Sequence, residues 1–468
     1  MVFLVLTPLV AGCLTTDEQV QAIEQEEAIV TEETITTDEP DEPDEPMEQE
    51  ETSVDEETVE AVELMSFEVD FTFDLQRTAA NPLRGFYTNY DWGEPVYDFP
   101  ASLEFAYIPL SELMSGPSNF TFDTGLEPRL VAAEGRAHQL ILRPYIDYPN
   151  KASGLPSFLE GQVEMRSYSE HGGGMSPDYN NSQLREALSS FIQAFGQAYD
   201  GDNRIAVIQL GLLGFWGEWH TWPHSEWFPG DEYLNEILDL YDQSFNHTLL
   251  QVRYPVANTP NLEIGFHDDS FAHSTIGDVE WYFHTRLVAS SADEHWKHSP
   301  VGGELRPEVQ QSIFEDDSNS QHQNFTQCVE ATHASMLLNY AAFSGGLNST
   351  NETQNAENAA LSLGYALHVS HANLSNNQLN LTIENRGIAP FYYPLSIQLT
   401  DGENTTLMLE LPVYIAGQTE SPISYDVSSL QLPSNDSVWT LSLYSESILP
   451  SQHILFATSP GNALIQVE

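Results

Sequence analysis

After Asn81 the sequence alternates regularly between short apolar runs and amphipathic stretches, and this pattern restricts the possible fold classes. Two amphipathic stretches, 183–199 and 233–245, carry apolar residues at the spacing of one helical face. Strands that alternate with helices form a parallel sheet covered by helices, and eight such strands close a barrel. The eight strand-like runs are 85–89, 105–110, 140–145, 205–213, 249–254, 264–267, 301–305 and 335–340. The sequence therefore predicts an α/β fold with a (β/α)8 TIM-like barrel.

The pattern changes near residue 355. A short helix is expected at 356–363, and after it polar and apolar residues alternate at 378–385, 395–399 and 438–444. Alternation with a period of two, broken by turn residues, is typical of antiparallel strands with one buried face. We therefore expect a barrel domain at 73–355 and a small all-β sandwich at 356–468.

The N-terminus begins with an uncharged apolar run, 2–12, followed by Cys13. The run is shorter than the roughly 20 residues that a membrane-spanning helix needs. Val10, Ala11, Gly12 and Cys13 resemble the lipobox of bacterial and archaeal lipoproteins, although no Lys or Arg precedes the run. The resemblance implies a signal peptide at 1–13, a lipid on Cys13 and a location on the outer face of the cell membrane. An N-terminal segment with an incidental cysteine is the alternative.

Residues 14–72 are dense in Asp and Glu and contain no Lys or Arg. Like charges repel and little apolar surface is present, so we expect a disordered, extended acidic linker. The whole chain carries a formal net charge of −57, with Lys151 and Lys297 as its only lysines. Such a charge excludes nucleic acid as an expected partner. It also suggests a saline or marine habitat, where salt screens self-repulsion.

Glu218 lies in an aromatic cluster that follows the fourth strand-like run. Trp216, Trp219 and Trp222 surround it in sequence. Side chains after strand C-termini face the active-site end of a parallel barrel. A carboxyl that loses water among indole rings favours its protonated form, which suits a proton donor, and indole faces bind sugar rings. The alternative is a Glu that pairs with an Arg beneath a core cluster.

Glu304 ends the seventh strand-like run. Catalytic glutamates at strands four and seven are the layout of the barrel-fold retaining glycoside hydrolases, which this chain resembles. The resemblance implies that Glu218 is the acid/base and Glu304 the nucleophile. That clan usually has Asn before the acid/base, whereas this chain has Gly217. Alternatively, Glu304 binds the Gly-rich turn or Arg306.

A second resemblance covers most of the chain after residue 80. It rests on NPLRGFY at 81–87, GFWGEWH at 214–220, GFHDDSF at 265–271, GGE at 302–304 and THASMLLN at 332–339. These motifs resemble paired, glycoside-hydrolase-like domains of unknown function found in exported bacterial lipoproteins. The resemblance implies a barrel and a trailing sandwich but not a substrate.

Further polar residues are candidates for substrate binding, some because they end predicted strands and the others because they could complete a polar pocket. Asp268 and Asp269 end the sixth run, where they could bind sugar hydroxyls or a hard cation such as Ca²⁺. Adjacent strand residues point oppositely, so we expect one of the two to face the site. The other candidates are Arg84, Arg143, Tyr145, His220, His333 and Asn339.

Phosphate-loop, dinucleotide, zinc-protease and nucleophile-elbow motifs are absent from the sequence. We expect no cofactor and no catalytic metal, although a Ser-His-Asp site formed by distant residues stays open. The leading hypothesis is a surface glycoside hydrolase that acts on extracellular polysaccharide or glycan through Glu218 and Glu304. The alternatives are a non-catalytic glycan-binding lipoprotein and a structural envelope protein.

Overall fold

The computed structural model describes residues 66–91, 99–256, 258–315, 322–345, 347–400, 406–411, 421–426, 438–460 and 465–467. All of them belong to one compact unit, Val62–Glu468. Cys13 and the acidic linker up to residue 65 lie outside the described residues, so their predicted roles stay predictions. Within the described part, no helix is both long enough and apolar enough to cross a membrane.

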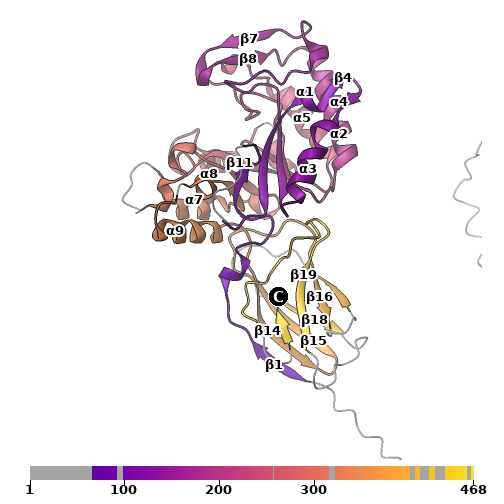
Figure 1. The fold of residues 1–468 in the computed structure, drawn as a ribbon, viewed down its shortest axis with the longest axis vertical. Helices are drawn as coiled ribbons and strands as arrows, with labels where there is room; N and C mark the ends of the chain where they lie inside the picture. Colours follow the sequence, from indigo (N-terminus) through magenta and orange to yellow (C-terminus); the bar gives the residue numbers. More distant parts are fainter. Residues whose placement is uncertain are drawn as a thin grey trace, which may run out of the picture. The chain divides into compact units, whose positions relative to one another are not determined.

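Eight parallel strands close a barrel, which confirms the predicted fold class (Figure 1). In barrel order they are β2 (Gly85–Asn89), β3 (Leu103–Pro109), β6 (Gln139–Tyr145), β9 (Ile205–Gln209), β10 (Leu249–Val252), β11 (Ile264–Phe271), β12 (Val301–Leu305) and β13 (Met336–Leu338). β13 pairs with β2 through Met336 and Gly85, which closes the ring. Each strand-like run of the sequence therefore supplies one strand of the barrel, in chain order.

Helices pack between the barrel strands and around them. They are α1 (Leu110–Leu113), α2 (Phe122–Gly125), α3 (Glu127–Glu134), α4 (Ser182–Tyr199), α5 (Asp231–Ser244), α6 (Phe283–Ala289), α7 (Phe325–Thr332), α8 (Tyr340–Ser344) and α9 (Thr350–Leu361). In α4, Asn181 caps the first turn by accepting from the amides of Gln183 and Leu184, and the face that includes Leu188 and Phe195 is buried.

Short 3₁₀ helices occur in several of the connections. They span Leu75–Thr78, Ser157–Leu159, Glu170–Gly172, Ser225–Trp227, Thr259–Asn261, His295–Lys297, Pro307–Val309 and Ser312–Phe314. Two hairpins also leave the barrel. They are β4 (Met114–Gly116) with β5 (Asn119–Phe120), and β7 (Met165–Tyr168) with β8 (Gly174–Pro177). The β7–β8 hairpin is the one that reaches the candidate site.

Two four-stranded sheets share one apolar core and form the predicted sandwich. One sheet contains β1 (Phe67–Asp70), β14 (Leu367–Ser375), β15 (Gln378–Asn385) and β18 (Ser421–Asp426). The other contains β17 (Thr406–Glu410), β16 (Ser396–Thr400), β19 (Trp439–Tyr444) and β20 (Ile465–Val467). Hydrogen bonds join the sandwich to barrel residues near the beginning of strands, for example from Gln139 Nε2 to the Ser447 carbonyl at 3.0 Å.

Three boundaries differ from the sequence-based expectation. β1, which falls in the segment expected to be linker up to residue 72, pairs antiparallel with β14 and is an edge strand of the sandwich (Figure 1). α9 crosses the expected boundary at 355 and contacts the barrel, because Asn355 Nδ2 donates to the Phe314 carbonyl at 2.7 Å. β9 ends at Gln209, and the apolar residues after it form a buried loop.

Candidate active site

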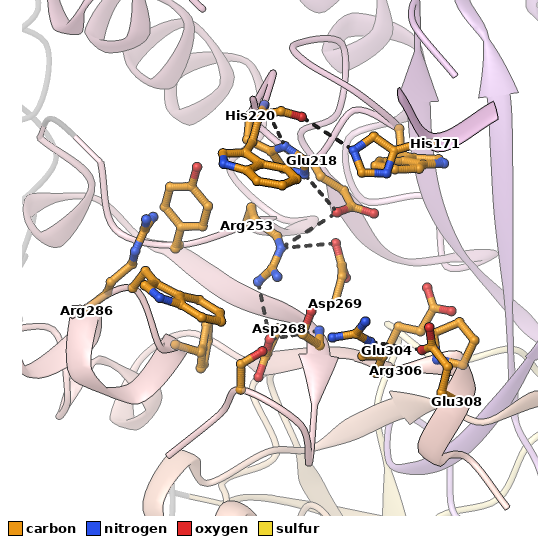
Figure 2. Close-up of a pocket in the computed structure, with 18 of the residues that line it drawn as sticks. His171, Glu218, His220, Arg253, Asp268, Asp269, Arg286, Glu304, Arg306 and Glu308 are labelled. Atoms are coloured by element: carbon orange, nitrogen blue, oxygen red, sulfur yellow. Dashed lines mark hydrogen bonds and ion pairs between the residues drawn. The ribbon is translucent and has the colours of Figure 1, made fainter. Parts of the chain in front are cut away.

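A cavity of about 1040 Å³ opens at the carboxyl ends of the barrel strands. Its walls come from the loop after β9, from the ends of β10, β11 and β12, and from the β7–β8 hairpin. Glu218 and Glu304 both line it, as do Asp268 and Asp269 (Figure 2). The fold therefore brings the predicted carboxylates to one cavity, at the end of the barrel where such sites form.

A glycine-rich loop holds Glu218. The Glu218 amide donates to the Phe215 carbonyl at 2.8 Å, and the Trp219 amide donates to the Leu213 carbonyl at 3.0 Å. Gly217 has φ +70°, and a Cβ there would lie 3.1 Å from Gly211 Cα. These backbone contacts on both sides of Glu218 fix the position of its Cα atom.

Three basic side chains surround the Glu218 carboxyl. Arg143 Nη1 and His220 Nε2 each lie 3.5 Å from it, and Arg253 Nε lies at 4.0 Å. The side chain of Glu218 keeps 15% of its exposure, so it also faces the cavity. A negative charge on Glu218 thus has opposite charges beside it.

Glu304, on β12, lies in surroundings that disfavour a negative charge, unlike those of Glu218. It is half-buried at the cavity wall. Loss of water around the carboxyl, and then the negative charges of Asp269 and Glu218, raise the Glu304 pKa well above its ordinary value, against the opposing effect of Arg143 and Arg253. Glu304 therefore favours its protonated form.

Beneath these two groups lies a buried ionic network centred on Arg143. Arg143 donates to Asp269 Oδ1 at 2.9 Å, to Gln209 Oε1 at 2.7 Å and to the Tyr107 hydroxyl at 3.1 Å. Asp269 also contacts His267 Nδ1 at 3.0 Å. Burial lowers the His267 pKa to about 4, although Asp269 opposes that shift, so the imidazole is neutral at ordinary pH. This network fixes the floor of the cavity.

Arg253 joins the carboxylates of the site. Its Nη1 lies 3.3 Å from Asp268 Oδ1, and its Nε lies 3.5 Å from Asp269 Oδ2 (Figure 2). Both aspartates border the cavity, whereas strand alternation predicted that only one would. The β11–β12 register is irregular between Asp268 and Phe271, so the simple alternation does not hold there.

Aromatic side chains form the wall near Glu218. Trp216 and Trp222 line the cavity, with Trp222 64% exposed. Trp219, predicted as a third sugar platform, is buried, and its Nε1 donates to the Gly211 carbonyl at 3.0 Å. It supports the loop from below and has no face open to a ligand.

Four other candidates lie outside the cavity. Arg84 is buried and donates to Thr78 Oγ1 and to the Leu361 carbonyl, while Tyr145 packs against Tyr107 and Tyr148. Arg84 therefore contacts the last residue of α9, and Tyr145 belongs to a cluster of tyrosine rings. His333 ends α7 in a left-handed conformation and stacks on Trp296, with ring centroids 3.6 Å apart. Asn339 caps α8 by accepting from the Ala342 amide.

The sequence interpretation missed several residues of the cavity. Arg253 and Tyr254 directly follow β10, and a cation at the end of an expected barrel strand was the signal for them. Trp281 and Arg286 come from the long connection after β11, where no strand end marks them. Among the described residues, no cluster of His, Cys, Asp and Glu is arranged to hold a metal ion.

Comparison with known proteins assigns no family. The sequence matches no protein-family model and no curated protein. The motif resemblance to the paired domains of unknown function therefore stays an interpretation.

Three solved structures that resemble this one in fold are glycoside hydrolases. A GH5_18 enzyme from Bifidobacterium longum has a TM-score of 0.37 and 11% identity, over 60% of this chain and 79% of the other. Endo-glycoceramidase II from Rhodococcus sp. has a TM-score of 0.36 and 11% identity, over 76% and 98%. A family 39 glycoside hydrolase from Bacteroides cellulosilyticus has a TM-score of 0.37 and 9% identity, over 75% and 80%. Likenesses this low carry no argument about activity, which rests on the site itself.

Proposed function

We propose that this protein is a glycoside hydrolase that acts on extracellular polysaccharide or glycan through Glu218 and Glu304. The observation that carries the proposal is a pair of carboxyl groups in one cavity with opposite electrostatic surroundings. Glycoside cleavage needs one carboxylic acid to protonate the leaving oxygen and one carboxylate on the other side of the bond. Cavity-lining tryptophans Trp216 and Trp222 supply the apolar faces that sugar rings stack on.

The charges favour an allocation of roles opposite to the one implied by the family resemblance. Glu304, whose pKa is raised, is the better proton donor to the glycosidic oxygen. Glu218, beside Arg143 and Arg253, is the better carboxylate. In a retaining reaction Glu218 attacks the anomeric carbon as the C–O bond breaks, and Glu304 then takes a proton from the water that releases the sugar.

Substitution of each carboxyl group tests the proposal. Glu218→Gln and Glu304→Gln are each expected to lower kcat by about 10²–10⁴-fold, the usual contribution of one such group. Glu226→Gln is the matched control, because Glu226 is exposed and does not line the cavity. Full activity of either cavity variant, with circular dichroism unchanged, would remove that residue from the mechanism.

Gly217 favours a second candidate function, a non-catalytic glycan-binding protein. A Cβ at this position would lie 3.1 Å from Gly211 Cα and 3.3 Å from the Pro144 carbonyl oxygen. The loop therefore disfavours the Asn that usually precedes the acid/base in the resembling hydrolases. This candidate predicts glycan affinity that falls with Trp216→Ala, and no product at any protein concentration.

Anchoring is a separate proposal that rests on the lipobox-like residues 10–13. We propose that a lipid on Cys13 holds the protein on the outer face of the cell membrane, with the acidic segment as a spacer. Cys13→Ser should release the protein from the membrane fraction into the medium. Continued membrane association of this variant would refute the anchor.

A further inference from the structure

We infer that the cavity takes an acidic glycan, and that Arg286 binds the carboxylate or sulfate group of that glycan. The inference rests on the proposed carbohydrate site and names the chemical class of its ligand. It begins from the one arginine that lines the cavity and has no acidic partner in the part of the chain that the structure describes.

Arg286 lies on α6 and faces the cavity with its side chain half-buried. Its guanidinium carbon lies 4.1 Å from the centroid of the Tyr254 ring. Among the described residues, it forms no ion pair and no side-chain hydrogen bond. The chain has 71 acidic residues and only 14 Lys and Arg, so an unpaired arginine is unexpected on charge statistics alone.

The other two arginines of the cavity are neutralised within the protein. Arg253 contacts Asp268, Asp269 and Glu218, and Arg306 Nε donates to Glu308 Oε2 at 2.9 Å. Their charge is therefore balanced before any ligand arrives. Arg286 has its positive charge available for a ligand.

The Tyr254 ring helps to hold the Arg286 guanidinium in place, because the guanidinium carbon lies over the ring. The N–H donors of a guanidinium can bind a carboxylate or sulfate by two parallel hydrogen bonds. Trp281 also lines the cavity and is 54% exposed, which supplies a face for the sugar ring. Figure 2 shows Arg286 well separated from Glu304, so the acidic group binds away from the proton donor.

Matched acidic and neutral glycans test this inference on the full chain. The probes are polygalacturonate with its methyl ester, and a sulfated galactan with its desulfated form, measured by titration calorimetry at about 0.5 M NaCl to screen the protein's net charge. At least one acidic member is expected to bind about tenfold more tightly than its neutral partner. Which pair shows the preference distinguishes carboxylate from sulfate.

Variants assign the preference to Arg286. Arg286→Gln should abolish the preference, and Arg286→Lys should keep part of it because the charge remains. Arg386→Gln should keep all of it. Arg386 is a matched control, because it also lies over an aromatic ring, Phe73, but pairs with Glu384.

The outcomes separate this inference from the proposed hydrolysis. Equal binding of acidic and neutral glycans, no binding of any acidic probe, or a preference that survives Arg286→Gln would overturn the acidic-glycan inference, even if a neutral glycan is cleaved. Arg286-dependent binding without cleavage would support the inference and count against hydrolysis.

Discussion

At the scale of single residues, the exposure of Trp219 and Trp222 assigns a structural role to the first and a binding role to the second. Trp219 is buried with its indole N–H hydrogen-bonded, whereas Trp222 is 64% exposed at the cavity. Trp219→Ala should lower the free energy of unfolding by about 3–5 kcal/mol. Trp222→Ala should leave it within about 1 kcal/mol and weaken glycan binding. Denaturant unfolding and calorimetry measure the two effects, and equal stability losses would contradict the assignment.

Glu304 gives a pH prediction whose sign follows from its raised pKa. Between the unfolded pKa of about 4.5 and the higher folded pKa, the folded state binds more protons, so this group makes the protein less stable as pH rises. Glu304→Gln should therefore have a larger free energy of unfolding than the wild type at pH 7.5, with no gain near pH 4.

Glu308→Gln is the control for that comparison. The hydrogen bond with Arg306 lowers the Glu308 pKa, so removal of this charge should give no gain at pH 7.5. A Glu304→Gln variant that is less stable than the wild type at pH 7.5 would contradict the raised pKa. Activity should also fall at high pH, as Glu304 loses the proton that it donates.

The sequence was sufficient to predict those site residues whose location follows from the position of a strand end. Glu304, Asp268 and Asp269 were predicted because they end strand-like runs of the sequence, although β11 continues to Phe271. His333 and Asn339 were chosen on residue type, but they cap helices, and side-chain direction is not readable from one sequence. The pairing of Arg253 with several carboxylates depends on contacts between separate strands, which residue spacing does not give.

At the scale of elements, all eight barrel strands were predictable because each is a short apolar run between helices or loops. Strand ends were less predictable. The run 205–213 was read as one strand, but β9 ends at Gln209, where the chain turns into the glycine-rich loop that carries Glu218. β1 could not be assigned from its acidic composition, because its pairing with β14 joins residues about 300 positions apart.

The irregular pairing of β11 with β12 depends on Gly303. Its φ is +134°, and a Cβ there would lie 2.2 Å from the Asp268 carbonyl oxygen. Gly303→Ala should therefore destabilise the fold by about 1–3 kcal/mol or more and lower activity, because it displaces Asp268 and Glu304 together. Gly161→Ala is the control: φ is also positive, at +75°, but the Cβ would meet no atom within 4 Å. Equal thermal stability of both variants would contradict this account.

At the scale of the whole molecule, the net charge of −57 predicts a dependence on salt. Self-repulsion among the carboxylates weakens as the screening length shortens from about 30 Å at 0.01 M to about 3 Å at 1 M. The melting temperature should therefore rise by several degrees between low salt and seawater ionic strength. Thermal melts in NaCl and KCl measure it, and a flat or falling curve would remove the inference of a saline habitat.

If the barrel cavity cleaves glycosidic bonds with Glu218 and Glu304, as we propose, the full chain should release sugars from a polysaccharide. The most direct test incubates the full chain with a panel of neutral and acidic polysaccharides and follows the reducing ends by proton NMR. At least one polysaccharide is expected to be cleaved, the first sugar released should keep its anomeric configuration, and Glu218→Gln should release sugar at least about 100-fold more slowly. No release from any polysaccharide, or release by Glu218→Gln at the wild-type rate, would contradict hydrolysis through these two residues.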